Sequence, residues 1–298
     1  MDAAVSIAGR WALVADMMLV FGVPLFTIYT ADPGKVPLRA VVTATAIMGL
    51  LLSGAGMAVL AASMTGVPLA EVDGATIALL VTGTAAGTAF LVRAIALSIA
   101  LTIALGDDGR AARSGLALCG AVALASLAWT GHGVMDDGRT GIVHLVADIL
   151  HLLAAGAWVG ALAALAWLLI GSRTAPTLAW RALGGFASAG TVAVGLVLAS
   201  GAVNTWLLVG PANLPSLGNS TYGRLLLIKL ALFAVMVVLA ALNRFRLTPA
   251  LGAAAANGDT RRAARALRLS IALELSLAIA ILGLVAWLGT LAPPISTG

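Results

Sequence analysis

Long apolar stretches, separated by short polar or Gly/Pro-containing segments, run along almost the whole chain. About 20 apolar residues are enough for a helix to cross the hydrocarbon core of a bilayer. Eight stretches reach this length: 8–30, 38–63, 75–105, 113–132, 142–171, 181–209, 223–246 and 267–291. The pattern predicts an all-α membrane protein, a bundle of eight transmembrane helices. The third, fifth and sixth are longer than a crossing needs, so we expect them to tilt or to project beyond the hydrocarbon.

The composition excludes a water-soluble protein. Of the 298 residues, 61% are hydrophobic and 10% are charged, against about 45–50% and about 25% in soluble domains. The mean hydropathy of +1.07 also excludes a disordered chain. No polar stretch is long enough to form an extramembrane domain, so we expect a single polytopic transmembrane domain over residues 1–298.

Lysine and arginine are concentrated in alternate connections between the predicted helices. The first, third, fifth and seventh connections carry twelve of them: Lys35, Arg39, Arg110, Arg113, Arg173, Arg181, Arg244, Arg246, Arg261, Arg262, Arg265 and Arg268. The even connections carry Arg139 alone. Because cationic loops stay in the cytoplasm, this asymmetry predicts that both termini lie on the outward, periplasmic side. The net charge of +5 therefore reflects membrane topology, and we expect the lipid bilayer as a partner and no nucleic acid.

The three histidines of the chain, His132, His144 and His151, fall within twenty consecutive positions. On a helix, His144 and His151 lie about 20° apart and Asp148 lies about 40° from His144, so the three form one polar stripe. The stripe opens the fifth predicted helix on the outward side, where His132 closes the fourth. Ionisable side chains inside a membrane are costly and usually functional. The alternative is a hydrogen-bonded polar seam between helices.

The neighbouring side chains favour copper as the ligand of this stripe. Imidazole suits copper, zinc, iron and nickel, whereas thioether sulfur selects Cu(I). Met57 and Met64 lie seven residues apart in the outward half of the second predicted helix, and Met135 lies beside His132. We therefore predict a copper site from these side chains: His132, His144, Asp148, His151, Met57, Met64 and Met135. For each methionine, simple core filling is the alternative.

Two stretches of the sequence resemble the copper resistance protein D (CopD) family. The first comprises residues 128–132 (AWTGH) and 144–160 (HLVADILHLLAAGAWVG). The second contains Asn204, Tyr222-Gly223-Arg224, Lys229, Asn243-Arg244 and Pro249. The resemblance implies a bacterial cytoplasmic-membrane protein of eight helices that handles copper ions. Such proteins are commonly taken to import copper, often alongside a periplasmic copper carrier of the copper resistance protein C type.

The same resemblance points to the polar centre of the protein, formed by His132, His144, Asp148 and His151, and to Trp158 as part of its helix signature. Family members often have a histidine in the first helix. This chain departs from that pattern, because residues 13–16 read LVAD. Asp16 or Met17 could take the place of this first-helix histidine.

Further polar residues lie inside other predicted helices. Arg93 and Glu274 are deep enough that an unpaired charge is costly, so we predict a structural ion pair between them, with a gating or proton-relay role as the alternative. Asn204 is expected to form an interhelical hydrogen bond. Lys229 is expected to meet Asp16 or Asp148.

Together these features predict a copper transporter that captures Cu(I) or Cu(II) on its outward face and passes it towards the cytoplasm by ligand exchange. The chain has no G-x4-G-K-[ST] nucleotide-binding sequence, so transport is passive or ion-coupled, and we expect no enzymatic activity. The single cysteine, Cys119, excludes a CxxC metal site. Two alternatives stay open: a haem b or quinone-linked electron-transfer protein, and a copper-binding assembly or sensor protein without transport.

The charge asymmetry generates a topology prediction. In a Cys119→Ala background, single cysteines at Ala112 or Ala256 should resist an impermeant thiol reagent in intact cells, whereas one at Gly138 should react. Labelling is measured by mass shift. Reversed labelling would contradict an outward-facing capture site.

Overall fold

The computed structural model describes residues 3–30, 36–106, 108–130, 138–170, 175–257 and 259–297. This part of the chain contains helices and no strand, and eight of its segments are long and apolar enough to cross a membrane. The predicted all-α membrane fold with eight crossings is confirmed. The helices are α1 (Ala3–Tyr29), α2 (Leu38–Thr65), α3 (Gly74–Gly83), α4 (Ala85–Leu105), α5 (Arg110–Ala125), α6 (Gly138–Ile170), α7 (Ala175–Val209), α8 (Thr221–Leu242), α9 (Thr248–Ala256) and α10 (Arg261–Leu288).

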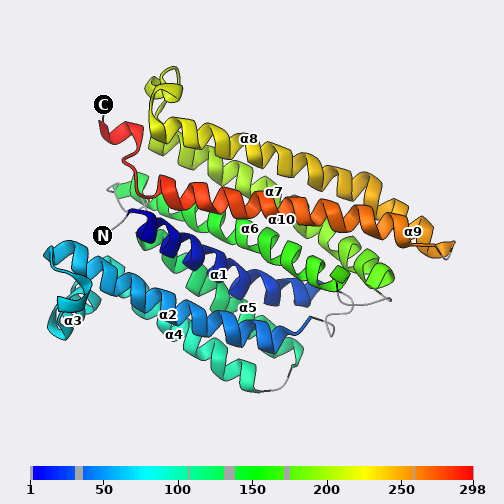
Figure 1. Cartoon of the computed structure of the whole chain (residues 1–298), viewed down its shortest axis with the longest axis horizontal. Helices are drawn as coiled ribbons and strands as arrows, with labels where there is room; N and C mark the ends of the chain where they lie inside the picture. Colours follow the sequence, from blue (N-terminus) through cyan, green and yellow to red (C-terminus); the bar gives the residue numbers. More distant parts are fainter. Residues whose placement is uncertain are drawn as a thin grey trace.

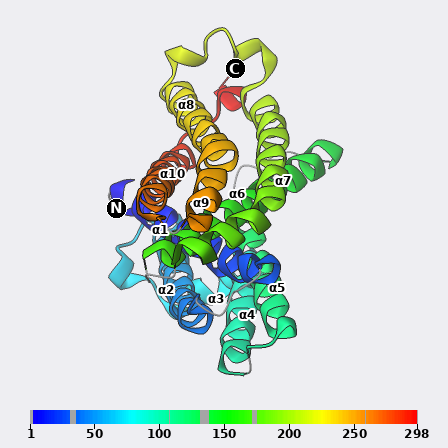
Figure 2. The same cartoon turned by 90° about the vertical axis from the view of Figure 1, so that its right-hand side faces the viewer.

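The helices form two groups that meet at the centre of the bundle. Helices α2 to α5 lie on one side and α7 to α10 on the other, with α1 and α6 between them (Figures 1 and 2). Helix α1 packs against α2, α5, α6 and α10, and α6 also packs against α7 and α10. The start of α1 lies at the end of α10, where Arg10 Nη1 donates a hydrogen bond to Gly289 O at 2.5 Å.

Glycines let α1, α5 and α6 approach one another closely. A Cβ atom on Gly22 of α1 would overlap Gly156 O of α6 and would lie 2.8 Å from Gly160 Cα. A Cβ atom on Gly120 of α5 would lie 2.6 Å from Phe21 Cα of α1. Such contacts need residues without side chains, as in other close helix pairs in membranes. Helix α1 is therefore joined backbone to backbone to both α5 and α6.

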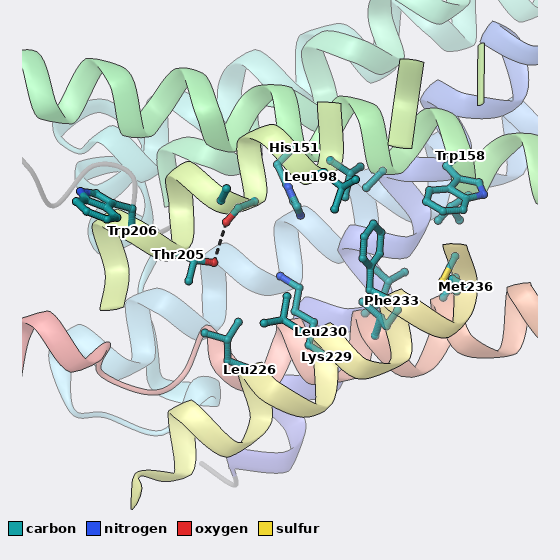
Figure 3. A pocket seen from close by; sticks show the side chains of 18 of the residues that line it. His151, Trp158, Leu198, Thr205, Trp206, Leu226, Lys229, Leu230, Phe233 and Met236 are labelled. Carbon is teal, nitrogen blue, oxygen red and sulfur yellow. Dashed lines mark hydrogen bonds between the residues drawn. The ribbon is translucent and has the colours of Figure 1, made fainter. Parts of the chain in front are cut away.

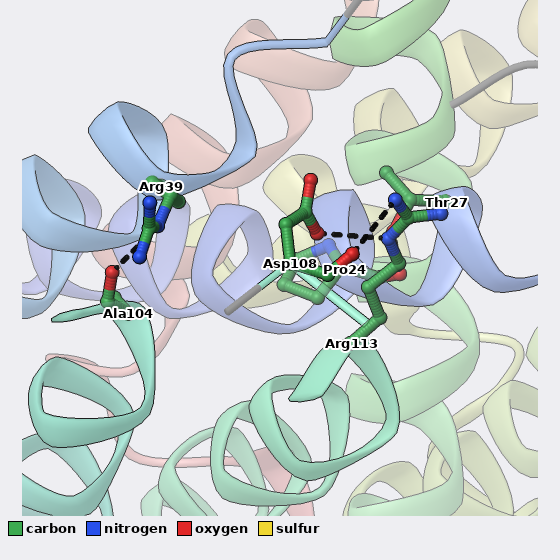
Figure 4. Close-up of polar contacts among 6 residues, drawn as sticks. All are labelled: Pro24, Thr27, Arg39, Ala104, Asp108 and Arg113. Atoms are coloured by element: carbon green, nitrogen blue, oxygen red, sulfur yellow. Dashed lines mark hydrogen bonds and ion pairs between the residues drawn. The ribbon is translucent and has the colours of Figure 1, made fainter. Parts of the chain in front are cut away.

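Two arginines stabilise the end of the bundle opposite the termini. Arg39 Nε donates to Ala104 O at 3.0 Å and joins the start of α2 to the end of α4. Arg113 Nε forms an ion pair with Asp108 Oδ1 at 2.9 Å in the loop before α5 (Figure 4). The described cations of the odd connections thus gather at one end of the bundle.

The predicted third helix, 75–105, is divided in the structure, which corrects that boundary. Helix α3 ends at Gly83, and the Thr84 side chain begins α4 by accepting a hydrogen bond from Gly87 N at 2.9 Å. A Cβ atom on Gly87 would overlap the backbone of Leu80 and Val81, so α3 turns back closely on the start of α4. The crossing helix is α4 alone, and α3 is a short helix at the terminal end of the bundle (Figure 1).

The predicted seventh helix, 223–246, continues further than expected. A π-helical turn, Asn243–Leu247, joins α8 to α9, and the combined segment runs to Ala256. Pro249 lies in the first turn of α9, where a missing N–H is tolerated. Helices α6 and α7, of 33 and 35 residues, are longer than a crossing needs, as expected.

The glycine contact generates a stability prediction. Gly22→Ala should lower the free energy of unfolding by about 1–3 kcal/mol, because its methyl group meets backbone atoms that cannot rotate away. The thermal unfolding midpoint in detergent measures this effect. Gly195→Ala on α7 is the matched control, since nothing lies within 4 Å of its Cβ position. Equal stability of the two variants would contradict a packing role for Gly22.

Candidate functional site

Asp148 and His151 of α6 are both held by polar side chains of α7. Asn204 Nδ2 donates to Asp148 Oδ1 at 2.6 Å, which confirms the interhelical hydrogen bond predicted for Asn204. His151 Nδ1 lies 3.0 Å from Ser200 Oγ. The α6 stripe therefore continues across the helix interface to a second polar row on α7.

The Ser200 contact determines which ring nitrogen of His151 is available. The Ser200 hydroxyl donates to Leu196 O at 2.5 Å, so its oxygen is left to accept a hydrogen bond from His151 Nδ1–H. In a neutral imidazole the other nitrogen, Nε2, then carries a lone pair. The ring also packs against Gly201, whose Cβ position is 3.3 Å from His151 Cε1. His151 is thus held in an orientation that leaves Nε2 as a potential metal ligand.

Three cavities follow one another along α6, and we number them from the end that contains the termini. The first, of about 280 Å³, is lined by Asp148, Asn204, Tyr222 and Lys229. The second, of about 440 Å³, shares His151 and Lys229 with the first. Figure 3 shows the His151 ring and the Lys229 ammonium pointing into it from α6 and α8. The first two cavities therefore meet at these two side chains.

Two cations, Lys229 and Arg10, are among the described residues that line the first cavity, and Lys229 also lines the second. Lys229 lines the first cavity together with His151 and Asp148. Two acidic residues were predicted as partners of Lys229. Asp148 lines the first cavity together with Lys229, whereas Asp16 lies against Gly49 of α2. A positive charge at the junction of two cavities opposes the permanent binding of a metal cation there.

Two methionines that were not among the predicted ligands line the second cavity. Met18 of α1 and Met236 of α8 are both buried and lie at the wall of this cavity with Trp158 and Phe233. Figure 3 shows Met236 near Trp158, on the far side of the cavity from Trp206. Spacing within one helix does not show which helices are neighbours, so the sequence carried no signal for this pair.

The predicted ligands on α2 lie away from the stripe. Met57 is 6% exposed and packs with Ala61 and Leu80 in a small apolar cluster. Met64 is 64% exposed at the end of α2. Helix α2 packs against α1, α3 and α4 and belongs to the other helix group. The structure therefore does not bring Met57 or Met64 to the α6 side chains.

The histidines differ in how far the structure describes them. His144 is 1% exposed on α6, one turn before Asp148, and is not among the residues that line the three cavities. His132 and Met135 lie outside the described residues. Within the described ranges, no three His, Cys, Asp or Glu side chains converge in a way that would hold a metal ion.

The predicted ion pair between Arg93 and Glu274 is not formed. Glu274 of α10 accepts a hydrogen bond from Asn243 Nδ2 at the start of the π-helical turn. Arg93 is buried on α4, which packs against α2, α3 and α5 in the other helix group. The predicted pairing is wrong. Both side chains lie deep in the membrane helices, as the sequence indicated, but α4 and α10 do not pack against each other.

The separation of Arg93 and Glu274 generates a prediction of additivity. Unfolding free energies are measured in mixed detergent micelles for Arg93→Met, Glu274→Gln and the double variant. Because the two side chains share no partner, the losses should add to within about 0.5 kcal/mol. A double variant that is clearly more stable than the sum of the single losses would show that the two charges meet.

Comparison with known proteins identifies the family. The family model described as "Copper resistance protein D-like, N-terminal domain" matches residues 1–142, and "Copper resistance protein D" matches residues 180–288. Copper resistance protein D of Pseudomonas syringae pv. tomato is 44% identical over 317 aligned residues, covering all of both chains. Inner membrane protein YebZ of Escherichia coli K12 is 30% identical, over 82% of this chain and 84% of that protein. Copper transport protein CutJ of Bacillus subtilis is 38% identical over 40% of this chain and 22% of that protein.

No solved structure matches. The relatives are named for copper resistance, copper transport and the inner membrane, and the chain belongs to the copper resistance protein D family as a multi-pass inner-membrane protein.

Proposed function

We propose that this protein imports copper ions from the periplasm to the cytoplasm through the space between α6, α7 and α8. The observation that carries the proposal is the His151 ring. Its Nδ1 contacts Ser200, so that Nε2 carries the lone pair, and the ring lines both the first and the second cavity. The family membership supplies copper as the cargo. The positive-inside pattern supports an orientation with the first cavity on the periplasmic side, and import is the direction that the resemblance to the family implies.

The ligands along this route change from oxygen and nitrogen to sulfur. Asp148, oriented by Asn204, and His151 Nε2 stand at the first cavity, and the Met18 and Met236 thioethers stand in the second. Thioether sulfur favours Cu(I), so the second cavity suits the reduced ion. We assign His132 and Met135 to capture of the ion, and His144 of α6 to its transfer towards Asp148 and His151.

Lys229 gives the site the weak binding that transport requires. Conduction needs a site that is favourable enough to enter and weak enough to leave. A cation that lines the same cavity as His151 and Asp148 lowers the affinity for a copper ion at their junction. The site is therefore suited to passing an ion onward and unsuited to storing it. A periplasmic carrier of the copper resistance protein C type is part of this proposal as the donor of the ion.

The electron-transfer alternative receives less support from the geometry. A haem b iron needs two axial ligands on opposite faces. Among the described residues the histidines are His144 and His151, which lie about 10 Å apart on the same helix. An absorption spectrum of the purified protein distinguishes the two functions, because a Soret band would favour the haem protein.

The first functional prediction concerns the α6 stripe. His151→Ala should nearly abolish copper binding and uptake in folded protein, because it removes the nitrogen that both cavities share. Asp148→Asn should weaken binding less, by about 10–100-fold, and His132→Ala should mainly slow entry. Elemental analysis, uptake into vesicles and thermal stability are measured together. If His151→Ala binds and moves copper normally, or only unfolds, the stripe is architecture and the assignment fails.

The second prediction separates the two sets of methionines. Met236→Leu should reduce uptake of Cu(I) under reducing conditions, since leucine keeps the volume and removes the thioether. Met64→Leu on the exposed end of α2 is the matched control and should leave uptake unchanged. A loss in the Met64 variant without a loss in the Met236 variant would move the route out of the second cavity.

A further inference from the structure

The third cavity has a different chemistry from the other two. It has a volume of about 420 Å³ and lies between α6, α7, α8, α10 and the π-helical turn. Its polar lining comes mainly from Glu274, Asn243 and Arg244, and none of the described residues that line it is a histidine, cysteine or methionine. Oxygen donors without nitrogen or sulfur ligands suit a proton or a hard cation better than Cu(I).

Glu274 and Asn243 form an incomplete hydrogen-bonded pair in this cavity. Glu274 is 1% exposed, and its Oε1 accepts from Asn243 Nδ2. Asn243 Oδ1 is also buried and has no hydrogen-bond partner. A proton on Glu274 Oε2 would supply that missing donor, because a carboxylic acid and an amide can pair through two antiparallel hydrogen bonds. The protonated acid therefore satisfies both side chains, whereas the carboxylate leaves one acceptor unused.

The charges around Glu274 favour the same conclusion. Helix α10 packs against α1, α6, α8, α9 and the π-helical turn, and among the described residues that line the cavity Arg244 is the one cation. Arg244 Nη1 is occupied by α7, where it donates to Ala187 O at 2.7 Å and to Thr191 Oγ1. No ion pair to Glu274 is formed in the described part of the chain. An ionised carboxylate in such a place is costly, and a bound proton removes the cost.

Trp158 connects Glu274 to the copper route. It lines both the second and the third cavity, and its ring lies edge to face with Phe233, with 5.9 Å between the ring centroids. The Trp158 indole and the Glu274 side chain both line the third cavity. An indole N–H is a donor only, so an ionised carboxylate in the same cavity attracts it more strongly than a neutral acid does. The ionised form thus holds Trp158 between the cavities, and the protonated form releases it.

We propose that Glu274, paired with Asn243, is a proton-binding site whose occupancy opens the Trp158 partition between the second and third cavities. This inference rests on the copper transport proposed above and adds the proton that controls it. In the proton-bound state the proton is on Glu274 Oε2 and is shared with Asn243 Oδ1. On release it leaves through the third cavity, at the end of the bundle where the described cations of the odd connections gather.

The proton site is tested without copper by infrared spectroscopy. Purified protein is titrated over the pH range in which it stays folded, and the C=O stretch of protonated carboxyl groups is followed. We expect a band that titrates in the wild type, is lost in Glu274→Gln and is retained in Glu71→Gln, the exposed glutamate that serves as matched control. A band that persists in Glu274→Gln, or no titrating band in the wild type, would overturn the proposal.

The control of passage is tested by copper uptake into vesicles with equal pH on both sides. Wild-type uptake should fall by about tenfold for each pH unit above the infrared midpoint, because only the protonated fraction is open. Glu274→Gln resembles the protonated acid, so it should keep the acid rate at every pH with unchanged copper binding. The same pH dependence in Glu274→Gln would overturn the inference while leaving copper transport intact.

Two further outcomes separate the inference from the proposed function. If no variant takes up copper while the infrared band behaves as expected, copper transport and its control fail and the proton site stands. If Glu274→Gln yields little folded protein, Glu274→Asp replaces it. Its infrared midpoint and its uptake midpoint should shift by the same amount, and independent shifts would overturn the coupling.

Discussion

The close contact between α1 and α6 is the constraint on which the other features depend. Gly22 meets Gly156 and Gly160 without intervening side chains, so the two helices touch through their backbones. In a bilayer, helix association relies on such packing because lipid tails are as apolar as leucine. The contact fixes α6 against the N-terminal group of helices. The other face of α6 is then free to carry polar side chains towards α7 and α8.

This arrangement makes α6 the axis of the proposed route. Asp148, His151 and Trp158 follow one another along the helix and line the first, second and third cavities in that order. Asn204 holds Asp148 and Ser200 holds His151 by hydrogen bonds, whereas the Trp158 ring packs edge to face against Phe233. Asp148 and His151 therefore have fixed orientations, while the cavities beside them leave room for an ion on the proposed route.

The sequence predicted what depends on one helix at a time. The lengths of the apolar stretches predicted the eight membrane-crossing helices. Helical spacing predicted that Asp148 and His151 share one face of a helix, and Asn204 was expected to form a hydrogen bond between helices. It did not predict relations between helices. Arg93 and Glu274 are both deep and opposite in charge, yet they lie in different helix groups, and Met57 faces Leu80 instead of the stripe. The break at Thr84 and the π-helical turn at Asn243 were missed because both lie inside continuous apolar stretches.

The division of ligand types along α6 gives a physical reason for a partition. Nitrogen and sulfur donors suited to copper lie on one side of Trp158, and the oxygen donors Glu274 and Asn243 lie on the other. On the proposed route, a copper ion that leaves the methionines finds no imidazole or thioether among the described residues of the third cavity, so it is bound more weakly there. A proton on Glu274 does not compete for those sulfur ligands. Separate chemistries on the two sides thus let one ion control the passage of the other without displacing it from its site.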